Sequence, residues 1–413
     1  MGIAWLFLLN SFVIPTSHRL LMKKIVYIFF YCFLTAVHSF AQGGNSLSGT
    51  VTDSTSGKPL AGVSVFLNST SKGTVTRADG SFVLPGIPGG RYELIISAIG
   101  YETFVIGISS RNLPPALKIA LHTKASELAS FTVEPYLKDG WKRWGKFFLD
   151  NFIGTTENAS STSIKNKEVL RFHFYKKSNR MSVTAIEPLI IENKALGYNL
   201  EYRLERFTCD FSDNIISYFG YPLFRDMESE DPGRMQKWAQ HRQAAYMGSL
   251  MHFMRSLYNG QIHEDGFIVD HEINVPNLEK KRVKERYNPL LTQTDSFSID
   301  TLHYFWEILR QPDYFTRIVR GPEGLLTIHE PDQAKVMFFT GKCTVIYGNG
   351  RMGIAYQESG IKLMTGEAIV IEENGSYYPP QEVLTLGNWG RTETMANLLP
   401  RDFGMYGPQV LKH

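Results

Sequence analysis

The chain has 413 residues, of which 43% are hydrophobic and 13% aromatic, and its formal net charge is +3. This composition excludes a disordered chain, because it supplies enough apolar surface for folded cores in two or three domains. The first 41 residues hold three basic and no acidic side chains, so the rest of the chain is neutral and its charge implies no nucleic-acid partner.

Residues 22–41 have the pattern of an export signal. Two lysines precede an apolar run of roughly a dozen residues, and Ser39-Phe40-Ala41 supplies small residues around a cleavage position. The run is too short for a membrane-spanning helix, which needs about 20 apolar residues. We therefore expect residues 1–41 to be a leader that is removed before Gln42, with translation starting at Met22. The alternative, a two-pass membrane hairpin, would need a second and equally short apolar run to span.

Two cysteines, Cys209 and Cys343, follow the leader. An oxidising compartment would permit a disulfide between them, but the sequence does not give their separation. We expect two buried free thiols, and two cysteines in so long a chain exclude a disulfide-dependent scaffold.

Residues 46–121 form short alternating strands with turn residues every eight to twelve positions, which predicts a seven-stranded β-sandwich of transthyretin-like or immunoglobulin-like type. The segment contains the patterns G-x-V-x-D, G-x-P-L-x-G-V-x-V, T-x-x-D-G-x-F and G-Y. In these patterns it resembles the carboxypeptidase-like regulatory domain, a transthyretin-like sandwich. The resemblance implies an accessory module at the front of an exported bacterial protein, without peptidase chemistry.

A polar linker at 122–136 leads into a β-rich α+β domain predicted over 137–413. Gly154 ends its first helix, as a helix C-terminal glycine should. The spacing of three and four between aromatic residues predicts that one face of this helix packs in a core. These residues are Trp141, Trp144, Phe147, Phe148 and Phe152.

The segment from Tyr198 to Phe207 alternates between apolar and charged residues, which predicts a long strand in an antiparallel sheet with one wet face. Strict alternation places Arg206 on the apolar face with Leu204, and Phe207 on the charged face.

One long helix is predicted over 231–259, with Asp231-Pro232 at its start. Methionines and leucines form one stripe, and His241 and His252 lie opposite with Arg242. The two histidines are about 16 Å apart along a helix, so they cannot share a metal ion. This face is either a binding site or ordinary packing. If it is a binding site, we expect replacement of Arg242 or His252 with alanine to leave the fold intact. The candidate binding residues are Arg242, Tyr246, His252 and Arg255.

The rest of the chain predicts strands and two short helices, at Thr301–Gln311 and Thr392–Leu398. Two triplets, His263-Glu264-Asp265 and Asp270-His271-Glu272, contain potential metal ligands. Adjacent residues on a strand point to opposite faces, so each triplet offers two ligands at most to one side. We therefore predict no metal site.

Several short motifs in the second domain are similar to those of uncharacterised exported proteins of Bacteroidetes that carry the same N-terminal module. No activity is implied by this resemblance. The motifs are Trp141-Lys142-Arg143-Trp144, Leu196-Gly197-Tyr198, Tyr246-Met247-Gly248-Ser249, Gly387-Asn388-Trp389-Gly390 and Leu398-Leu399-Pro400-Arg401-Asp402-Phe403.

The sequence contains no H-x-x-E, H-E-x-x-H or G-x-S-x-G motif, no P-loop and no dinucleotide fingerprint, so we predict no catalytic residue and no cofactor. A pair of glycosidase carboxylates is not excluded. We expect a non-catalytic exported protein of the periplasm, outer-membrane face or cell surface that binds an envelope protein or a glycan and can associate peripherally with the outer membrane. The alternative is an uncharacterised hydrolase with its site in 137–413.

Overall fold

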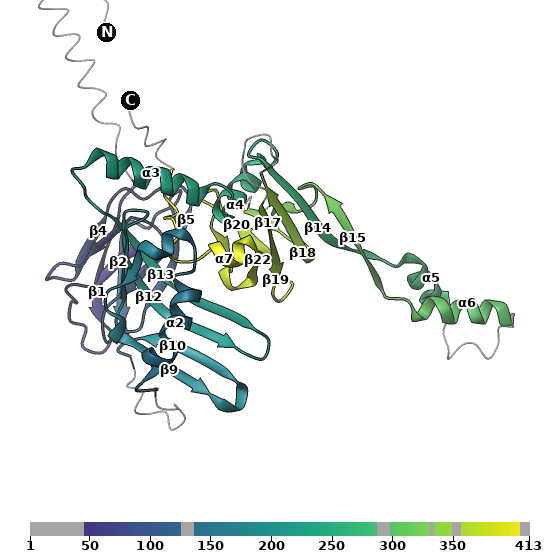
Figure 1. The fold of residues 1–413 in the computed structure, drawn as a ribbon, viewed down its shortest axis with the longest axis horizontal. Coiled ribbons are helices and arrows are strands. Elements are labelled where there is room, and N and C mark those ends of the chain that lie inside the picture. The colour runs from purple at the N-terminus through teal and green to yellow at the C-terminus, as the bar shows by residue number, and fades with distance from the viewer. Residues whose placement is uncertain (1–44, 125–135, 287–297, 330–333, 349–356, 405–413) are drawn as a thin grey trace, which may run out of the picture.

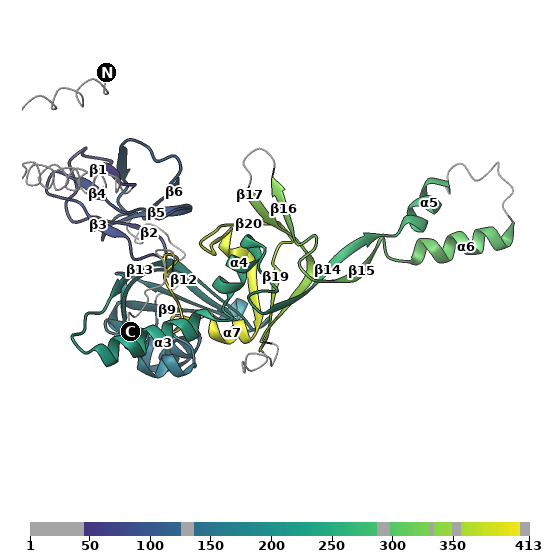
Figure 2. The same ribbon diagram turned by 90° about the horizontal axis from the view of Figure 1, so that it is seen from above.

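The computed structural model describes residues 45–124, 136–286, 298–329, 334–348 and 357–404. They form an N-terminal sandwich, a β-rich body that packs against the sandwich, and a long arm that projects from the body (Figures 1 and 2). The predicted signal peptide and most of the predicted linker lie outside the described residues. Within the part that is described, no helix has the length and apolar character required to cross a membrane.

The sandwich contains the seven predicted strands, arranged in two sheets with the orders β4-β1-β7 and β3-β2-β5-β6. Alternating apolar side chains fill the space between the sheets, among them Val51, Leu84, Leu94 and Ile119. The strands are β1 (Leu47–Asp53), β2 (Ser64–Leu67), β3 (Gly73–Val75), β4 (Ser81–Leu84), β5 (Arg91–Ser97), β6 (Phe104–Ser109) and β7 (Leu117–Leu121).

The first half of the body is a six-stranded sheet built around the long strand β12. Strand β13 pairs with one edge of β12, and the other edge pairs first with β11 and then with β10. Phe148 and Phe152 of helix α2 are fully buried in the core of this half, which confirms the predicted packing of the aromatic stripe. The elements are α2 (Gly140–Phe152), β8 (Thr162–Ile164), β9 (Leu170–Tyr175), β10 (Arg180–Ala185), β11 (Leu189–Asn193), β12 (Tyr198–Asp210) and β13 (Ile215–Asp226).

Strand β12 corrects the prediction of strict alternation. The predicted faces hold as far as Leu204, but Phe207 is buried and Arg206 is exposed, the reverse of what we expected. The cause is a β-bulge between Leu204 and Arg206, where the pairing with β13 shifts by one residue. An extra residue moves every later side chain to the other face, and here it keeps both halves of the strand facing the core.

The second half of the body has two sheets, with the orders β15-β14-β18-β19-β22 and β16-β17-β20-β21. Its core includes Phe253, Phe267, Val345, Ile361 and Trp389. The elements are α4 (Leu250–Asn259), β14 (Phe267–Pro276), β15 (Tyr314–Arg320), β16 (Leu326–His329), β17 (Ala334–Met337), β18 (Thr340–Tyr347), β19 (Gln357–Leu363), β20 (Ile369–Ile371), β21 (Tyr377–Tyr378), β22 (Val383–Gly387) and α7 (Asn388–Thr392).

Strands β14 and β15 also form the ribbon of the arm, and helices α5 (Leu278–Arg286) and α6 (Ile299–Arg310) lie at its far end (Figures 1 and 2). Helix α6 confirms the helix predicted near Thr301–Gln311. The helix predicted at Thr392–Leu398 is wrong, because α7 ends at Thr392 and the following residues form turns.

The predicted long helix is two helices, α3 (Pro232–Tyr246) and α4, which corrects the prediction of a continuous helix over 231–259. Gly248 lies between them with φ of +76°, a left-handed conformation that favours glycine. Ser249 then caps α4, because its hydroxyl accepts a hydrogen bond from the His252 backbone N–H at 3.1 Å. The Gly-Ser pair therefore ends one helix and begins the next.

The sandwich packs on β13 through a small apolar cluster of Phe66, Ile95, Tyr221 and Leu223. Backbone hydrogen bonds at the Ser69–Thr70 turn reinforce this contact, because the N–H of Ser69 donates to the Pro222 carbonyl and the carbonyl of Thr70 accepts from Phe224. Sheet β3-β2-β5-β6 is therefore buried on both faces along β2 and β5, once by the sandwich core and once by the body.

Cys209 and Cys343 are buried free thiols, as predicted, and they belong to two different hydrophobic cores. Burial raises the pKa of both thiols, most strongly that of Cys343. Both residues act as small apolar side chains.

Candidate functional site

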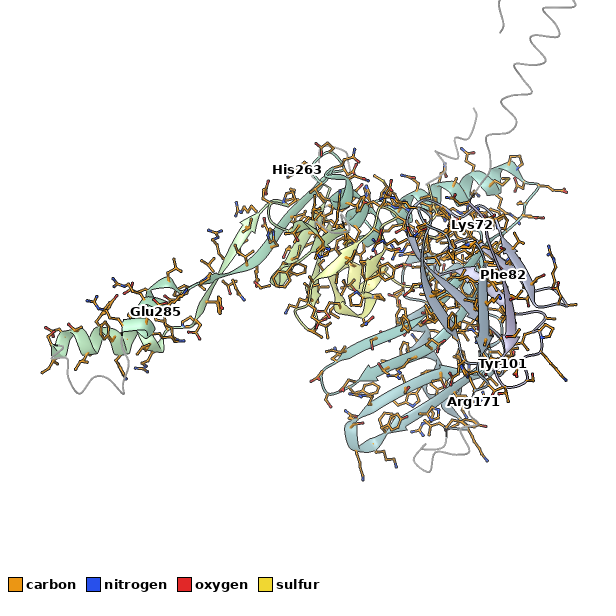
Figure 3. All side chains as sticks on the ribbon, turned by 180° about the vertical axis from the view of Figure 1, so that it is seen from behind. Lys72, Phe82, Tyr101, Arg171, His263 and Glu285 are labelled. Carbon is orange, nitrogen blue, oxygen red and sulfur yellow. The ribbon has the colours of Figure 1, made fainter. Side chains whose placement is uncertain are left out.

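The sandwich, the body and the C-terminal segment meet around a pocket of about 490 Å³, which we call the junction pocket. Figure 3 labels Lys72 where the sandwich reaches this meeting point. The volume lies within the range of small-molecule sites in proteins. The lining residues are Ser71, Lys72, Tyr198, Asp226, Ala239, Arg242, Gln243, Tyr246, Arg255, Pro400, Asp402, Phe403 and Gly404.

Three of the four predicted binding residues, Arg242, Tyr246 and Arg255, line the junction pocket. His252 does not, but its ring lies behind Tyr246 with 4.7 Å between the two centroids. His241 faces a separate surface groove on the other side of α3. The break at Gly248 places His252 on a different helix, so the two histidines do not share a face.

Arg242 is held by the fold. Its Nε and Nη2 atoms donate to the carbonyls of Leu196 and Gly197 at 2.7 and 3.0 Å, and Nη2 also lies 2.8 Å from the Asp226 carboxylate. The guanidinium lies 3.8 Å from the centroid of the Tyr198 ring. The side chain is buried and donates to two carbonyls, so we now expect alanine at this position to destabilise the fold, where the sequence had suggested that it would leave the fold intact.

Arg255 fixes the C-terminal wall of the pocket. Its guanidinium donates to the carbonyls of Asn374, Arg401 and Phe403 at 3.1, 3.0 and 2.9 Å. Residues 400–404 have no regular secondary structure of their own, so these bonds replace the pairing that a strand would provide. Arg255 therefore supports the site by positioning the residues around it.

His252 is buried between rings and charged groups. Its Nδ1 accepts a hydrogen bond from the Gly248 N–H at 3.1 Å, so the neutral ring carries its proton on Nε2, which faces Asp265 at 3.8 Å. Burial lowers the pKa of His252 to about 4; Arg255 also lowers it, and Asp265 opposes the shift. The neutral imidazole is thus a fixed acceptor for the turn between α3 and α4.

The His252 environment predicts a pH-dependent stability. The unfolded side chain titrates near 6.5, so between about pH 6.5 and 4 the unfolded state binds a proton that the folded state does not, and stability falls as the pH is lowered. The expected loss from this residue reaches about 3 kcal/mol. Urea unfolding of the wild type and of His252→Asn from pH 7 to pH 4 measures it. The asparagine can accept the Gly248 bond without binding a proton, so equal pH dependence in the two proteins would contradict the assignment.

Several residues of the junction pocket were not among the predicted binding residues. Asp402 accepts two hydrogen bonds from Ser71, one from its N–H at 3.1 Å and one from its hydroxyl at 2.5 Å, and so joins the C-terminal segment to the sandwich. Tyr198 and Phe403 contribute aromatic walls. Tyr198, Asp402 and Phe403 all lie in the short motifs that the sequence singled out, but nothing in the sequence connected those motifs in space.

The pocket combines aromatic rings with polar groups that the fold already orients. The rings of Tyr246 and Phe403 are half-buried and their centroids are 5.7 Å apart. Around them lie the Arg242 guanidinium and the carboxylates of Asp226 and Asp402. Such a lining can pack the apolar face of a ligand on a ring and hydrogen-bond its polar edge.

A larger groove of about 940 Å³ lies along the other side of α3. Its walls carry mostly exposed charges of both signs, such as Lys194, Glu228 and Lys237. Its aromatic residue, Trp238, is buried, and its Nε1 donates to the Lys194 carbonyl at 2.9 Å. Apart from the His241 imidazole, the groove therefore offers no exposed aromatic ring to a ligand, and we place the candidate site at the junction pocket.

The two triplets of potential metal ligands, 263–265 and 270–272, have other roles in the fold. Among the described residues, no three His, Cys, Asp or Glu side chains are grouped so that they could hold a metal ion. In the first triplet, Asp265 instead accepts a hydrogen bond from Ser256. In the second, His271 is buried on β14, where it is paired with Val319 of β15 and Cys343 of β18.

Comparisons with known proteins bear on the sandwich. No curated protein matches this chain. Among solved structures, a chain of a type II cohesin–X-dockerin complex from Acetivibrio cellulolyticus is 24% identical with a TM-score of 0.18, and the match spans 22% of this chain and 64% of that one. A protein of unknown function from Bacteroides fragilis is 12% identical with a TM-score of 0.15, over 79% of this chain and 93% of that one.

A family model does match the N-terminal region. The model of the CarboxypepD_reg-like domain covers residues 47–133, which include all seven strands of the sandwich. The match agrees with the resemblance seen in the turn motifs of this region. The N-terminal sandwich of this protein is a CarboxypepD_reg-like domain.

Proposed function

We propose that the protein is a non-catalytic, exported binding protein of the cell envelope, in which the junction pocket binds a glycan. The main support for this proposal is the lining of the pocket, where the half-buried rings of Tyr246 and Phe403 lie beside charged groups that the fold holds in place. A sugar ring presents an apolar C–H face and a polar hydroxyl edge, so it matches both parts of this lining.

The polar groups of the pocket favour binding over catalysis. The guanidinium groups of Arg242 and Arg255 donate hydrogen bonds to backbone carbonyls, and the Asp402 carboxylate accepts two hydrogen bonds from Ser71. A general acid or base must exchange a proton with the substrate, and His252, the nearest imidazole, lies outside the lining residues. Groups held in this way orient a ligand without reacting with it.

The test uses two matched substitutions on α3. Gln243 is exposed at the rim of the junction pocket, whereas Gln240 is exposed on the same helix outside it. We expect Gln243→Trp to obstruct the pocket and to weaken binding by about tenfold or more, with Gln240→Trp unchanged. Binding is measured by saturation-transfer NMR on a panel of soluble hexose, N-acetylhexosamine and uronic-acid oligosaccharides. Absence of binding to the whole panel, or equal binding by both variants, would contradict the proposal.

One observation supports the alternative of a hydrolase. Asp226 and Asp402 both line the junction pocket, and two carboxylates across a sugar are what a glycosidase needs. Nitrophenyl glycosides of the same sugars provide the assay. Turnover that Asp226→Asn abolishes, while Asp231→Asn on the exposed start of α3 retains it, would establish catalysis and replace the binding proposal.

The proposed location rests on the leader sequence and on the type of sandwich, which is typical of exported proteins. Expression in a bacterial host followed by N-terminal sequencing tests it. We expect the isolated protein to begin near Gln42 and to be found in the envelope fraction. An uncleaved chain in the cytosolic fraction would contradict export and leave the pocket proposal to be judged by its own assay.

A further inference from the structure

The arm is a two-stranded ribbon that carries a helical tip well away from the rest of the protein (Figures 1 and 2). Figure 3 labels Glu285 on this tip. Helices α5 and α6 pack on each other, and side-chain bonds from Tyr304 to Glu279 and from Lys280 to the Gln311 carbonyl join them. Within the described residues, the tip therefore makes its packing contacts inside the arm.

Helix α6 has two apolar faces, of which only one is covered. Phe305 is buried at the contact with α5, and Val283 of α5 is buried as well. A second stripe, Ile299, Leu302 and Trp306, follows the helical spacing of three and four, and these side chains are 85%, 41% and 54% exposed. A contiguous apolar stripe on a surface marks an interaction site.

The charges beside the stripe indicate what covers it. Arg310 lies on the same face, with its guanidinium 4.3 Å from the centroid of the Trp306 ring. Helix α5, alongside, contains five basic and two acidic residues, and α6 contains one basic and two acidic residues, so the two helices together have a formal charge of +2. Lys281 and Arg286 are exposed and form no ion pair with another described residue. A second copy of this chain would bring two basic helices together, whereas an anionic surface would neutralise them.

We infer that the tip of the arm docks peripherally on an anionic lipid bilayer, with Trp306 at the level of the headgroups. Tryptophan and arginine at the edge of an apolar stripe are the composition of helices that lie in a membrane interface. The neutral charge of the whole chain does not oppose this, because basic residues act on a membrane only within a Debye length of its surface. The inference concerns a different surface from the junction pocket and does not depend on the proposed glycan.

Vesicle co-sedimentation of the protein without its leader tests the inference. The probes are vesicles of phosphatidylcholine alone and of an equal mixture with phosphatidylglycerol. We expect binding to the mixed vesicles that falls as salt is added. The affinity of the double variant Leu302→Ser/Trp306→Ser for the mixed vesicles should fall by at least about tenfold, because the variant lacks two of the three apolar anchors. Lys281→Glu/Arg286→Glu should lose the preference for anionic vesicles.

The matched control is Ile99→Ser, which removes an exposed apolar side chain from the sandwich and should bind as the wild type does. Thermal unfolding checks that all variants are folded. Failure of the wild type to bind mixed vesicles, or unchanged binding by the double variant, would overturn the inference. A molar mass by light scattering that drops from dimer to monomer in the double variant would assign the stripe to a second copy instead, and would overturn it too.

Discussion

Replacing Arg242 with alanine is expected to lower the free energy of unfolding by about 2 to 4 kcal/mol. The substitution removes two charge-assisted hydrogen bonds to the carbonyls of Leu196 and Gly197 and leaves both acceptors without their donor. It also removes the guanidinium from the face of Tyr198. The pair with Asp226 adds little, because that carboxylate is largely exposed to water.

Urea unfolding followed by circular dichroism measures the change. Arg234→Ala is the matched control, since Arg234 lies on the same helix but is exposed, and it should alter stability by no more than about 0.5 kcal/mol. Arg242→Met keeps most of the aliphatic stem, so it separates the loss of packing from the loss of hydrogen bonds. Similar stabilities of the wild type and Arg242→Ala would show that the guanidinium is not a structural group.

Replacing Leu223 with aspartate should detach the sandwich from the body. Leu223 is 2% exposed and packs against the sandwich in the cluster with Phe66 and Ile95. An unpaired carboxylate there must remain solvated, which costs at least about 3 kcal/mol of docking free energy. Its neighbour Phe224 points into the core of the body, so the body itself should stay folded.

Differential scanning calorimetry and small-angle scattering provide the measurements. We expect the variant to unfold in two separate transitions and to have a larger radius of gyration than the wild type. Ile215→Asp, at an exposed position of the same strand, is the control and should behave as the wild type does. A single transition with an unchanged radius in Leu223→Asp would mean that the interface does not depend on this cluster.

Local patterns predicted local structure well. The turn rhythm of residues 46–121 predicted every strand of the sandwich, and the aromatic spacing predicted α2. Alternation along β12 held until a bulge that depends on pairing with β13, which is not visible in β12 alone. The break between α3 and α4 was missed although Gly248-Ser249 is a recognisable end and cap, because the methionine and leucine stripe continues across it.

The candidate site, in contrast, could not be predicted from local patterns, because it depends on contacts between residues that are far apart in the sequence. Arg242 and Arg255 were selected for their chemistry, yet their partners are carbonyls 45 to 148 positions away along the chain. Asp402 was passed over because its partner, Ser71, lies in the other domain. The stripe on α6 fits an ordinary buried helix as well as an exposed one, and only the projection of the arm distinguishes them.

The contacts of residues 400–403 determine which part of the folding of this protein comes last. Its backbone and side chains bond to Ser69 and Ser71 near the start of the chain and to Arg255 in the middle. In a polypeptide synthesised from its N-terminus, the sandwich is complete about 280 residues before this segment emerges, so these bonds form only after the rest of the body has been made. The contact of the sandwich with β13 can therefore form first, and the bonds from the C-terminal segment close the joint between the domains as a late step in assembly.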